Sequence, residues 1–162
     1  MDAQTMATAY RTLADQNPSF AKAYPVESIQ SMIQQGIKLI AFDFGSTSRG
    51  FLTNMNVIHQ TLPSEMSIEA FAQIAASQLD VQFKPTTSPK VEHIAFGTLD
   101  ARRIRYELQL QSAGGMTTTD FDQYVGLRGK DVFIITFTTR PEDEEGYRPT
   151  FDRIASSFAI IP

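Results

Sequence analysis

Residues 132–137 read Val-Phe-Ile-Ile-Thr-Phe, a run that places apolar side chains on both sides of a β-strand. Because side chains alternate between the two faces of a strand, Val132 and Ile134 would point one way and Phe133 and Ile135 the other. An antiparallel sheet that is wet on one face would instead alternate apolar with polar residues. This strand therefore needs cover on both faces, which predicts helices on both sides of the sheet.

Apolar residues recur at helical spacing in four other segments, which supply that cover. The four sets are Met6, Tyr10 and Leu13; Val26, Ile29, Met32 and Ile33; Ile68, Phe71, Ala75 and Leu79; and Tyr147, Phe151, Ile154 and Phe158. Pro18 separates the first two helices, because proline disfavours helix in the residue before it. Ser67 is a suitable N-cap for the third. We expect the last helix to cover one face of the sheet, with an acidic run at residues 141–145 just before it.

The remaining apolar stretches have the length and composition of strands. They lie at residues 37–44, 51–60, 91–96 and 101–111, followed by the two strands of a meander that ends at 132–137. Gly114 and Gly115 suit a two-residue turn with positive φ, which would oppose Ile104 to Val125 on one apolar face.

Gly129 and Lys130 form a second candidate two-residue turn, with glycine at the first position as type II′ prefers. This turn opposes Arg128 to Asp131 and Leu127 to Val132, again with the apolar residues on one face. A chain of 162 residues fits one domain, so the sequence predicts a single domain, residues 1–162, of the α+β class. Its architecture would be a three-layer helix–sheet–helix sandwich around a mainly antiparallel sheet.

Composition excludes several classes of function. The formal net charge is −4, which disfavours nucleic-acid binding and docking on anionic membranes. The chain has no cysteine, so thiol catalysis, disulfides and cysteine-ligated zinc are ruled out. No apolar run approaches the roughly 20 residues that span a bilayer. The first residues also carry no export signal, so membrane anchoring would need a segment upstream of residue 1.

Sequence motifs predict no enzyme, no cofactor and no metal site. The loop at residues 45–50 resembles a phosphate-binding loop only superficially, because Phe51 and Leu52 stand where a lysine and a hydroxyl residue are required. His59 and His93 are the only histidines, and neither lies in a metal-binding spacing. The Gly-x-Ser-x-Gly pattern of serine hydrolases is also absent.

One polar group of residues on the central hairpin is a candidate binding patch. The Gly114-Gly115 register would oppose Arg105 to Tyr124 and Glu107 to Asp122, with Asp120 alongside, although like charges across a strand pair cost energy. One interpretation is a solvated end of the sheet; the other is a patch that binds a cation or a basic ligand group. The candidate residues are Arg103, Arg105, Glu107, Asp120, Asp122 and Tyr124.

Several segments together resemble the PsbP-like fold, in particular actinobacterial exported proteins and lipoproteins of the LpqN/LpqT kind. They are residues 36–43, 101–106 leading into the Gly-Gly hairpin, 122–125, 132–137 and 151–158. The resemblance runs from the second helix to the end of the chain, and its motifs are packing motifs. It implies a binding or accessory module, because most relatives are not enzymes and many bacterial ones are anchored outside the cytoplasmic membrane.

The function predicted from this resemblance is a non-catalytic binding or accessory module of the bacterial cell envelope, with an unknown protein or small molecule as partner. Two alternatives stay open. One is a hydrolase-like enzyme whose site joins His59 or His93 to an acid and a hydroxyl only in three dimensions. The other is a structural subunit that associates through an exposed apolar patch. Location outside the cytoplasm would require a native leader before residue 1, and otherwise the cytoplasm is expected.

Overall fold

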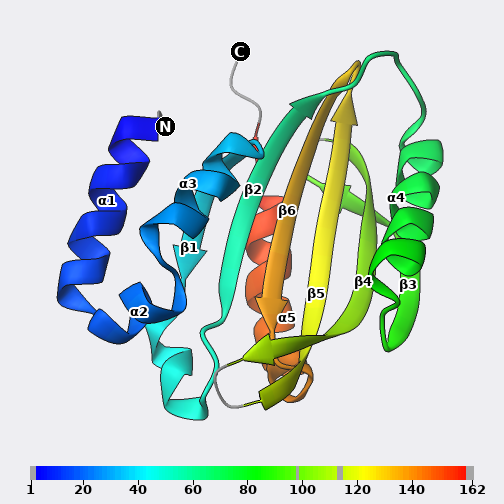
Figure 1. The fold of residues 1–162 in the computed structure, drawn as a ribbon. Coiled ribbons are helices and arrows are strands. Elements are labelled where there is room, and N and C mark those ends of the chain that lie inside the picture. The colour runs from blue at the N-terminus through cyan, green and yellow to red at the C-terminus, as the bar shows by residue number, and fades with distance from the viewer. Residues whose placement is uncertain (1–2, 98, 113–114, 160–162) are drawn as a thin grey trace.

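A six-stranded sheet with helices on both faces forms the centre of the computed structural model, which describes residues 3–97, 99–112 and 115–159 (Figure 1). The strand order is β1-β2-β6-β5-β4-β3, and every neighbouring pair is antiparallel. The strands are β1 (Ile37–Phe42), β2 (Asn54–Thr61), β3 (Thr87–Phe96), β4 (Leu99–Ser112), β5 (Gly115–Arg128) and β6 (Asp131–Thr139). The predicted α+β class and the three-layer sandwich around an antiparallel sheet are confirmed.

The helices follow the four predicted apolar stripes, with α2 and η1 as two additions. They are α1 (Ala3–Gln16), α2 (Pro18–Ala23), α3 (Val26–Gln34), α4 (Ile68–Phe83), α5 (Pro141–Ser156) and the short 3-10 helix η1 (Phe44–Arg49). Pro18 ends α1 as expected but also starts α2, because proline is well tolerated in the first turn of a helix. Among the described residues, no helix has both the length and the apolarity needed to cross a membrane.

Helix α4 covers one face of the sheet. Its N-terminus is capped as predicted, since the Ser67 hydroxyl oxygen accepts a hydrogen bond from the Ala70 amide at 3.1 Å. The core on this face consists of Ile68, Ala72 and Ala76 of α4 packed on Ile104, Tyr106, Leu108, Val125 and Val132 of the sheet. Ile104 and Val125 thus lie on the buried apolar face that the sequence predicts.

Helix α5 covers the opposite face, behind the sheet in Figure 1. Phe151 and Ala155 of the helix pack there on Phe96, Ala101, Tyr124, Ile135 and Phe137. The helix begins at Pro141, so the acidic run forms its first turn instead of preceding it, where carboxylates oppose the positive end of the helix dipole. β6 is therefore covered on both sides, as its two apolar faces require, with Val132 in the first core and Phe137 in the second.

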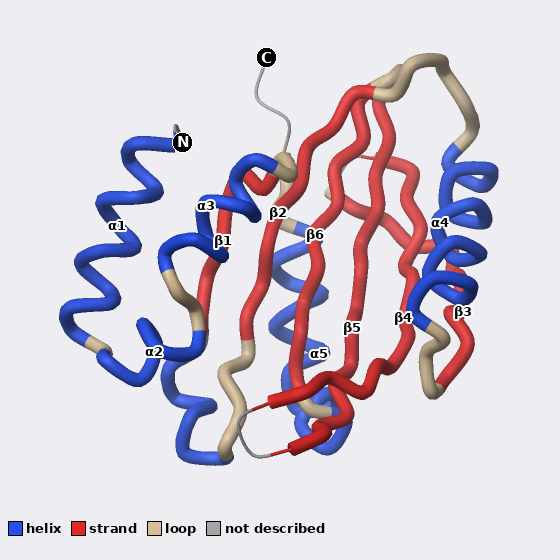
Figure 2. The backbone as a smooth tube through the Cα atoms, in the orientation of Figure 1, coloured by secondary structure: helices blue, strands red, loops and turns tan. Residues whose placement is uncertain are grey.

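Helices α1, α2 and α3 form a third core against β1, at the opposite edge of the sheet from α4 (Figure 2). Its buried centre is Tyr10, Phe20 and Ile29. Around this centre pack Ile40 and Phe42 of β1. The helices thereby bury the apolar side chains on one face of this edge strand.

The two predicted hairpins have different outcomes. The Gly129 turn is confirmed: β5 and β6 pair Arg128 with Asp131, and Gly129 has a φ of +59°. The register of the other hairpin is wrong by two residues, because β4 and β5 pair Ile104 with Gln123. Side chains alternate with a period of two, so this even shift leaves every side chain on its predicted face. The predicted turn residue Gly114 lies outside the described residues.

The segment between β1 and β2 also differs from the prediction. The expected loop at residues 45–50 is the 3-10 helix η1, and β2 begins only at Asn54. Asp43 caps η1, because its Oδ1 atom accepts a hydrogen bond from the Gly45 amide at 2.9 Å. This cap fixes the direction of the Asp43 carboxylate.

A substitution at Gly97 tests the close contact between this residue and the backbone that follows α5. It has a φ of +59°, and a Cβ atom there would overlap the carbonyl oxygen of Phe158, which follows α5. We expect Gly97→Ala to lower the free energy of unfolding by about 3–4 kcal/mol, since backbone strain and a backbone clash add. Gly50→Ala is the control, because Gly50 has a φ of +81° but no atom lies within 4 Å of the added Cβ. Urea denaturation measures both free energies of unfolding. Equal losses for Gly97→Ala and Gly50→Ala would contradict the close contact between Gly97 and Phe158.

Candidate functional site

Charged side chains from the sheet and α5 meet in a buried cluster, here named the charge network. Its members are Arg103 and Arg105 of β4, Asp120 and Asp122 of β5, and Glu144 and Arg148 of α5. Glu144 Oε1 lies 3.1 Å from Arg105 Nη2, and Glu144 Oε2 lies 2.6 Å from Arg148 Nη2. Only 7% of Glu144 is exposed, so this carboxylate joins α5 to the sheet inside the protein.

Asp122 and Arg103 form the centre of the network. Asp122 is 0% exposed and accepts two hydrogen bonds from the Arg103 guanidinium, one of them from Nε at 2.7 Å. Burial lowers the pKa of Arg103, but the hydrogen bond to Asp122 and the charges of Asp122, Tyr124 and Asp152 together raise that pKa above its ordinary value. Burial also raises the pKa of Asp122, against the hydrogen bond and the charge of Arg103. Two-point contact of this kind is the strongest arrangement available to a buried ion pair.

Asp120 is the least well satisfied carboxylate. It is 5% exposed, and its Oδ2 atom has no hydrogen-bond partner. Burial raises the pKa of Asp120 to about 7, although the charge of Arg105 lowers it. The carboxylates of Glu144, Asp122 and Glu107 raise it further. The Nε atom of Arg105 is also buried without a partner.

The structure thus brings the predicted polar patch together, but mostly beneath α5. Arg103, Asp120, Asp122 and Tyr124 are buried, so the interpretation as a solvated end of the sheet is wrong for these four. Glu107 keeps partial exposure. Sequence reasoning missed Glu144 and Arg148, because nothing in the local pattern says that the first turns of α5 lie over β4.

The corrected register changes which charges face each other. Arg105 lies opposite Asp122, which pairs unlike charges, whereas Glu107 lies opposite Asp120. Tyr124, predicted opposite Arg105, lies opposite Arg103 and stacks below its guanidinium, 5.2 Å from the ring centre. Within the described part of the chain, no three acidic or histidine side chains are arranged to hold a metal ion.

An apolar cavity of about 230 Å³ lies beside the network, between α5 and the β1–β2–β6 side of the sheet; we name it the α5 pocket. Its lining residues are Ala41, Phe42, Asp43, Thr53, Asn54, Met55, Phe137, Tyr147, Thr150, Phe151 and Ile154. The Tyr147 hydroxyl donates a hydrogen bond to Asp43 Oδ2 at 2.5 Å, which links α5 to the residue before η1. Such a cavity with a few polar groups among apolar walls is typical of a ligand site.

A column of aromatic rings connects the pocket to the charge network. Phe151 stacks on Phe137 with ring centres 4.2 Å apart and on Tyr147 with ring centres 5.5 Å apart. Phe137 meets Tyr124 edge to face at 5.6 Å. The Tyr124 hydroxyl donates to Asp152 Oδ1 at 2.5 Å, so α5 is held again at its far end. The position of the pocket wall therefore depends on the same contacts that bury the charges.

The histidines do not assemble the catalytic arrangement that the hydrolase alternative requires. His59 Nε2 lies 3.0 Å from Asp131 Oδ1, and the Thr61 hydroxyl donates to the same oxygen at 2.9 Å. In a hydrolytic triad the histidine stands between the acid and the nucleophile, whereas here the acid stands between the other two. His93 lies 3.0 Å from Asp100 on an exposed surface.

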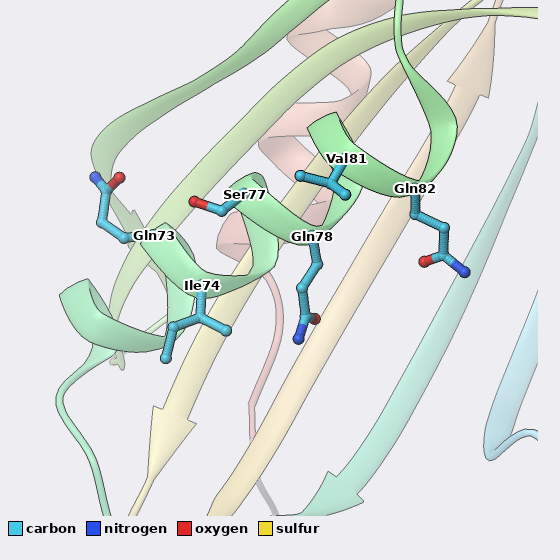
Figure 3. Close-up of a pocket in the computed structure, with 6 residues that line it drawn as sticks. All are labelled: Gln73, Ile74, Ser77, Gln78, Val81 and Gln82. Carbon is cyan, nitrogen blue, oxygen red and sulfur yellow. The ribbon is translucent and has the colours of Figure 1, made fainter.

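Exposed apolar side chains on α4 mark the surface that the structural-subunit alternative would use (Figure 3). Ile74 is 50% exposed and Val81 is 77% exposed. The polar side chains around them are Gln73, Ser77, Gln78 and Gln82. All six belong to one helix, so the surface has no opposing wall, and the polar residues divide its apolar area.

Fold and site together define an antiparallel α+β sandwich with an apolar pocket under one helix. No protein-family model matches the chain, and no curated protein matches it. Among solved structures the chain is similar to a Pseudomonas aeruginosa protein of unknown function for which a regulatory role has been suggested. That similarity has a TM-score of 0.58 at 16% identity over 68% of this chain and 74% of the other, and at this identity it shows the fold alone.

A second similar structure is a cyanobacterial PsbP protein from Synechocystis. The TM-score is 0.46 at 13% identity, over 67% of this chain and 68% of that one. PsbP is the family whose fold the sequence resembles, but a TM-score of this size does not establish kinship. The closer relation to LpqN/LpqT proteins stays a prediction.

The raised pKa of Asp120 predicts how stability depends on pH. An unfolded aspartate titrates near pH 4, so between about pH 4 and 7 the folded protein binds more protons than the unfolded chain. Stability contributed by the protonated form is therefore lost as pH rises through this window. Asp120→Asn, which cannot ionise, should unfold at a higher urea concentration than the parent protein at pH 8 and show a flatter profile.

Urea midpoints measured from pH 5 to pH 8 check this expectation. Asp80→Asn, on the exposed side of α4, is the control and should keep the parent slope. Equal slopes for the parent protein and Asp120→Asn would show that Asp120 is not the titrating group.

Proposed function

We propose that this chain is a non-catalytic binding or accessory module and that the α5 pocket is its ligand site. The observation that carries the proposal is the cavity of about 230 Å³ walled by stacked aromatic rings and closed at one side by the Tyr147–Asp43 hydrogen bond. Ligand pockets are concave and largely apolar, with few polar groups to orient the ligand, and this cavity has that character.

The hydrogen bonds of the rim favour binding over catalysis. Asp43 accepts from the Gly45 amide and from Tyr147, and the Thr53 hydroxyl shares a hydrogen bond with Thr139 at 3.0 Å. The Thr53 hydroxyl has only a second hydroxyl, which is a poor base, as its partner, whereas the Tyr147 hydroxyl ties α5 to the residue before η1. The charges of the network are likewise used in ion pairs that hold α5 in place.

The charge network gives this pocket a fixed wall. Glu144 joins the start of α5 to Arg105, and Tyr124 holds Asp152 near its end, so the helix is tied to the sheet at two points along its length. A site on a rigid element binds with less ordering cost than one on a loop. The pocket is therefore preformed, and its volume limits the ligand to one ring or a short alkyl group, below the ~300 Å³ of pockets for larger ligands.

Benzyl alcohol is the probe for this proposal. In ¹H–¹⁵N spectra it should shift the amides of the pocket residues and saturate at millimolar concentration, because a small apolar ligand gains only a few kcal/mol from burial. Thr150→Phe should abolish these shifts by filling the cavity, whereas Arg153→Phe on the exposed side of α5 should retain them. Shifts that persist unchanged in Thr150→Phe would place the ligand elsewhere and overturn the assignment.

The resemblance to exported proteins supports a further proposal, that the module works outside the cytoplasm, in the bacterial cell envelope. Expression of the gene from its native start, followed by cell fractionation, checks this location. Recovery with the envelope or the medium is expected. Recovery in the cytoplasmic fraction would contradict it.

A further inference from the structure

We infer that the α5 pocket selects small ligands with an apolar ring or chain and a protonated amine, and this inference rests on the proposed function. Among the described residues that line the pocket, Asp43 is the one acidic side chain, and none is a lysine, arginine or histidine. A ligand whose apolar part enters the cavity would therefore meet a single full charge, and that charge is negative. Opposite charge is favoured there and like charge is disfavoured.

The Asp43 carboxylate is held in position before any ligand arrives. Its backbone amide donates to the Thr53 carbonyl at 2.8 Å, and its Oδ1 atom caps η1 through the Gly45 amide at 2.9 Å. Its Oδ2 atom accepts from the Tyr147 hydroxyl at 2.5 Å. A carboxylate has about four acceptor positions, and these two side-chain contacts occupy two of them. The remaining positions can accept an ammonium without breaking the existing hydrogen bonds.

The exposure of Asp43 separates it from the carboxylates of the charge network. Asp122 is buried and paired with Arg103, whereas Asp43 is exposed and, among the described residues, forms no ion pair with an arginine or a lysine. An exposed carboxylate at the mouth of an apolar cavity can stay ionised while the ligand's ring is buried. The position therefore suits the charged end of an amphipathic molecule.

The surroundings of the mouth also favour a cation. Glu142, Asp143 and Tyr147 line an adjoining hollow, so the two depressions share the Tyr147 side chain. Arg140 pairs with both acids, at 3.3 Å from Glu142 and 2.9 Å from Asp143, so two carboxylates and one guanidinium lie beside this hollow. The shared residue, Tyr147, is aromatic, and an aromatic ring attracts a cation that lies over its face.

A set of three probes of similar size tests the inference: benzylamine, benzyl alcohol and benzoate, titrated at pH 7 into the ¹⁵N-labelled protein. Benzylamine should bind at least about tenfold more tightly than benzyl alcohol, because a hydrogen bond between ions is stronger than a neutral one. Benzoate should bind more weakly than either. All three should shift the same pocket amides.

Asp43→Asn should remove the preference, bringing benzylamine to within about twofold of benzyl alcohol. Asparagine is also a good cap, so the substitution should leave η1 intact, and the binding of benzyl alcohol reports on that directly. Asp15→Asn on α1 is the matched control for net charge and should keep the tenfold preference.

The failures of the two proposals are distinguishable. If benzyl alcohol and benzylamine bind the pocket equally well, or if Asp43→Asn keeps the preference, the amine selectivity is overturned and the proposed binding function stands. If neither probe shifts the pocket amides, both proposals fail together.

Discussion

Asp122 is a carboxylate with no exposed surface, and the rest of the sandwich is arranged so that this charge has a partner. Arg103 supplies that partner through a two-point contact, and Glu144 reaches the same region from α5 at 3.9 Å from Arg103. Removing one member of a buried pair typically costs about 3–5 kcal/mol, because the other charge is left uncompensated. Positions of α5 that move Glu144 away from the arginines are therefore strongly disfavoured.

This electrostatic constraint extends to the pocket through packing. Tyr124 lies below Arg103, Phe137 meets Tyr124 edge to face, and Phe151 and Tyr147 continue the column to the rim. Aromatic pairs of this geometry each add about 0.5–1.5 kcal/mol beyond their buried area. Helix α5 is held to the sheet by the charge network and by the stacked rings, so the cavity that the rings line keeps its shape.

Much of the fold follows from local patterns in the sequence. The two apolar faces of β6 required helices on both sides, Ser67 marked the start of α4, and Gly129 placed a turn correctly. The β4–β5 register failed because a shift of two residues leaves the buried face unchanged, so face patterning cannot detect it. Because the predicted register was wrong, the prediction also missed that Arg105 lies opposite Asp122.

Local sequence patterns could not predict the α5 pocket, for a different reason. Its rim joins Asp43 to Tyr147, which are 104 residues apart in the chain. Each residue alone has an ordinary local role, one as a helix cap and the other as part of an apolar stripe. Their contact depends on where α5 crosses the sheet. Glu144 fixes this crossing, but in the sequence it is only one of several acidic residues near the start of a helix.

The protein therefore uses its carboxylates in two physically different ways. In the charge network, burial raises the free energy of each charge, and arginines from β4 and α5 offset that cost. The buried carboxylates are poor ligand sites, because a carboxylate that loses its arginine partner is left with the full cost of burial. At the rim of the α5 pocket, the charge of Asp43 carries little desolvation cost because water reaches the carboxylate. A ligand can therefore add a contact there without first breaking an ion pair. This difference in solvation, more than the number of charges, is why we propose the exposed Asp43 beside an apolar cavity, and not the buried residues of the polar patch, as the site for recognition.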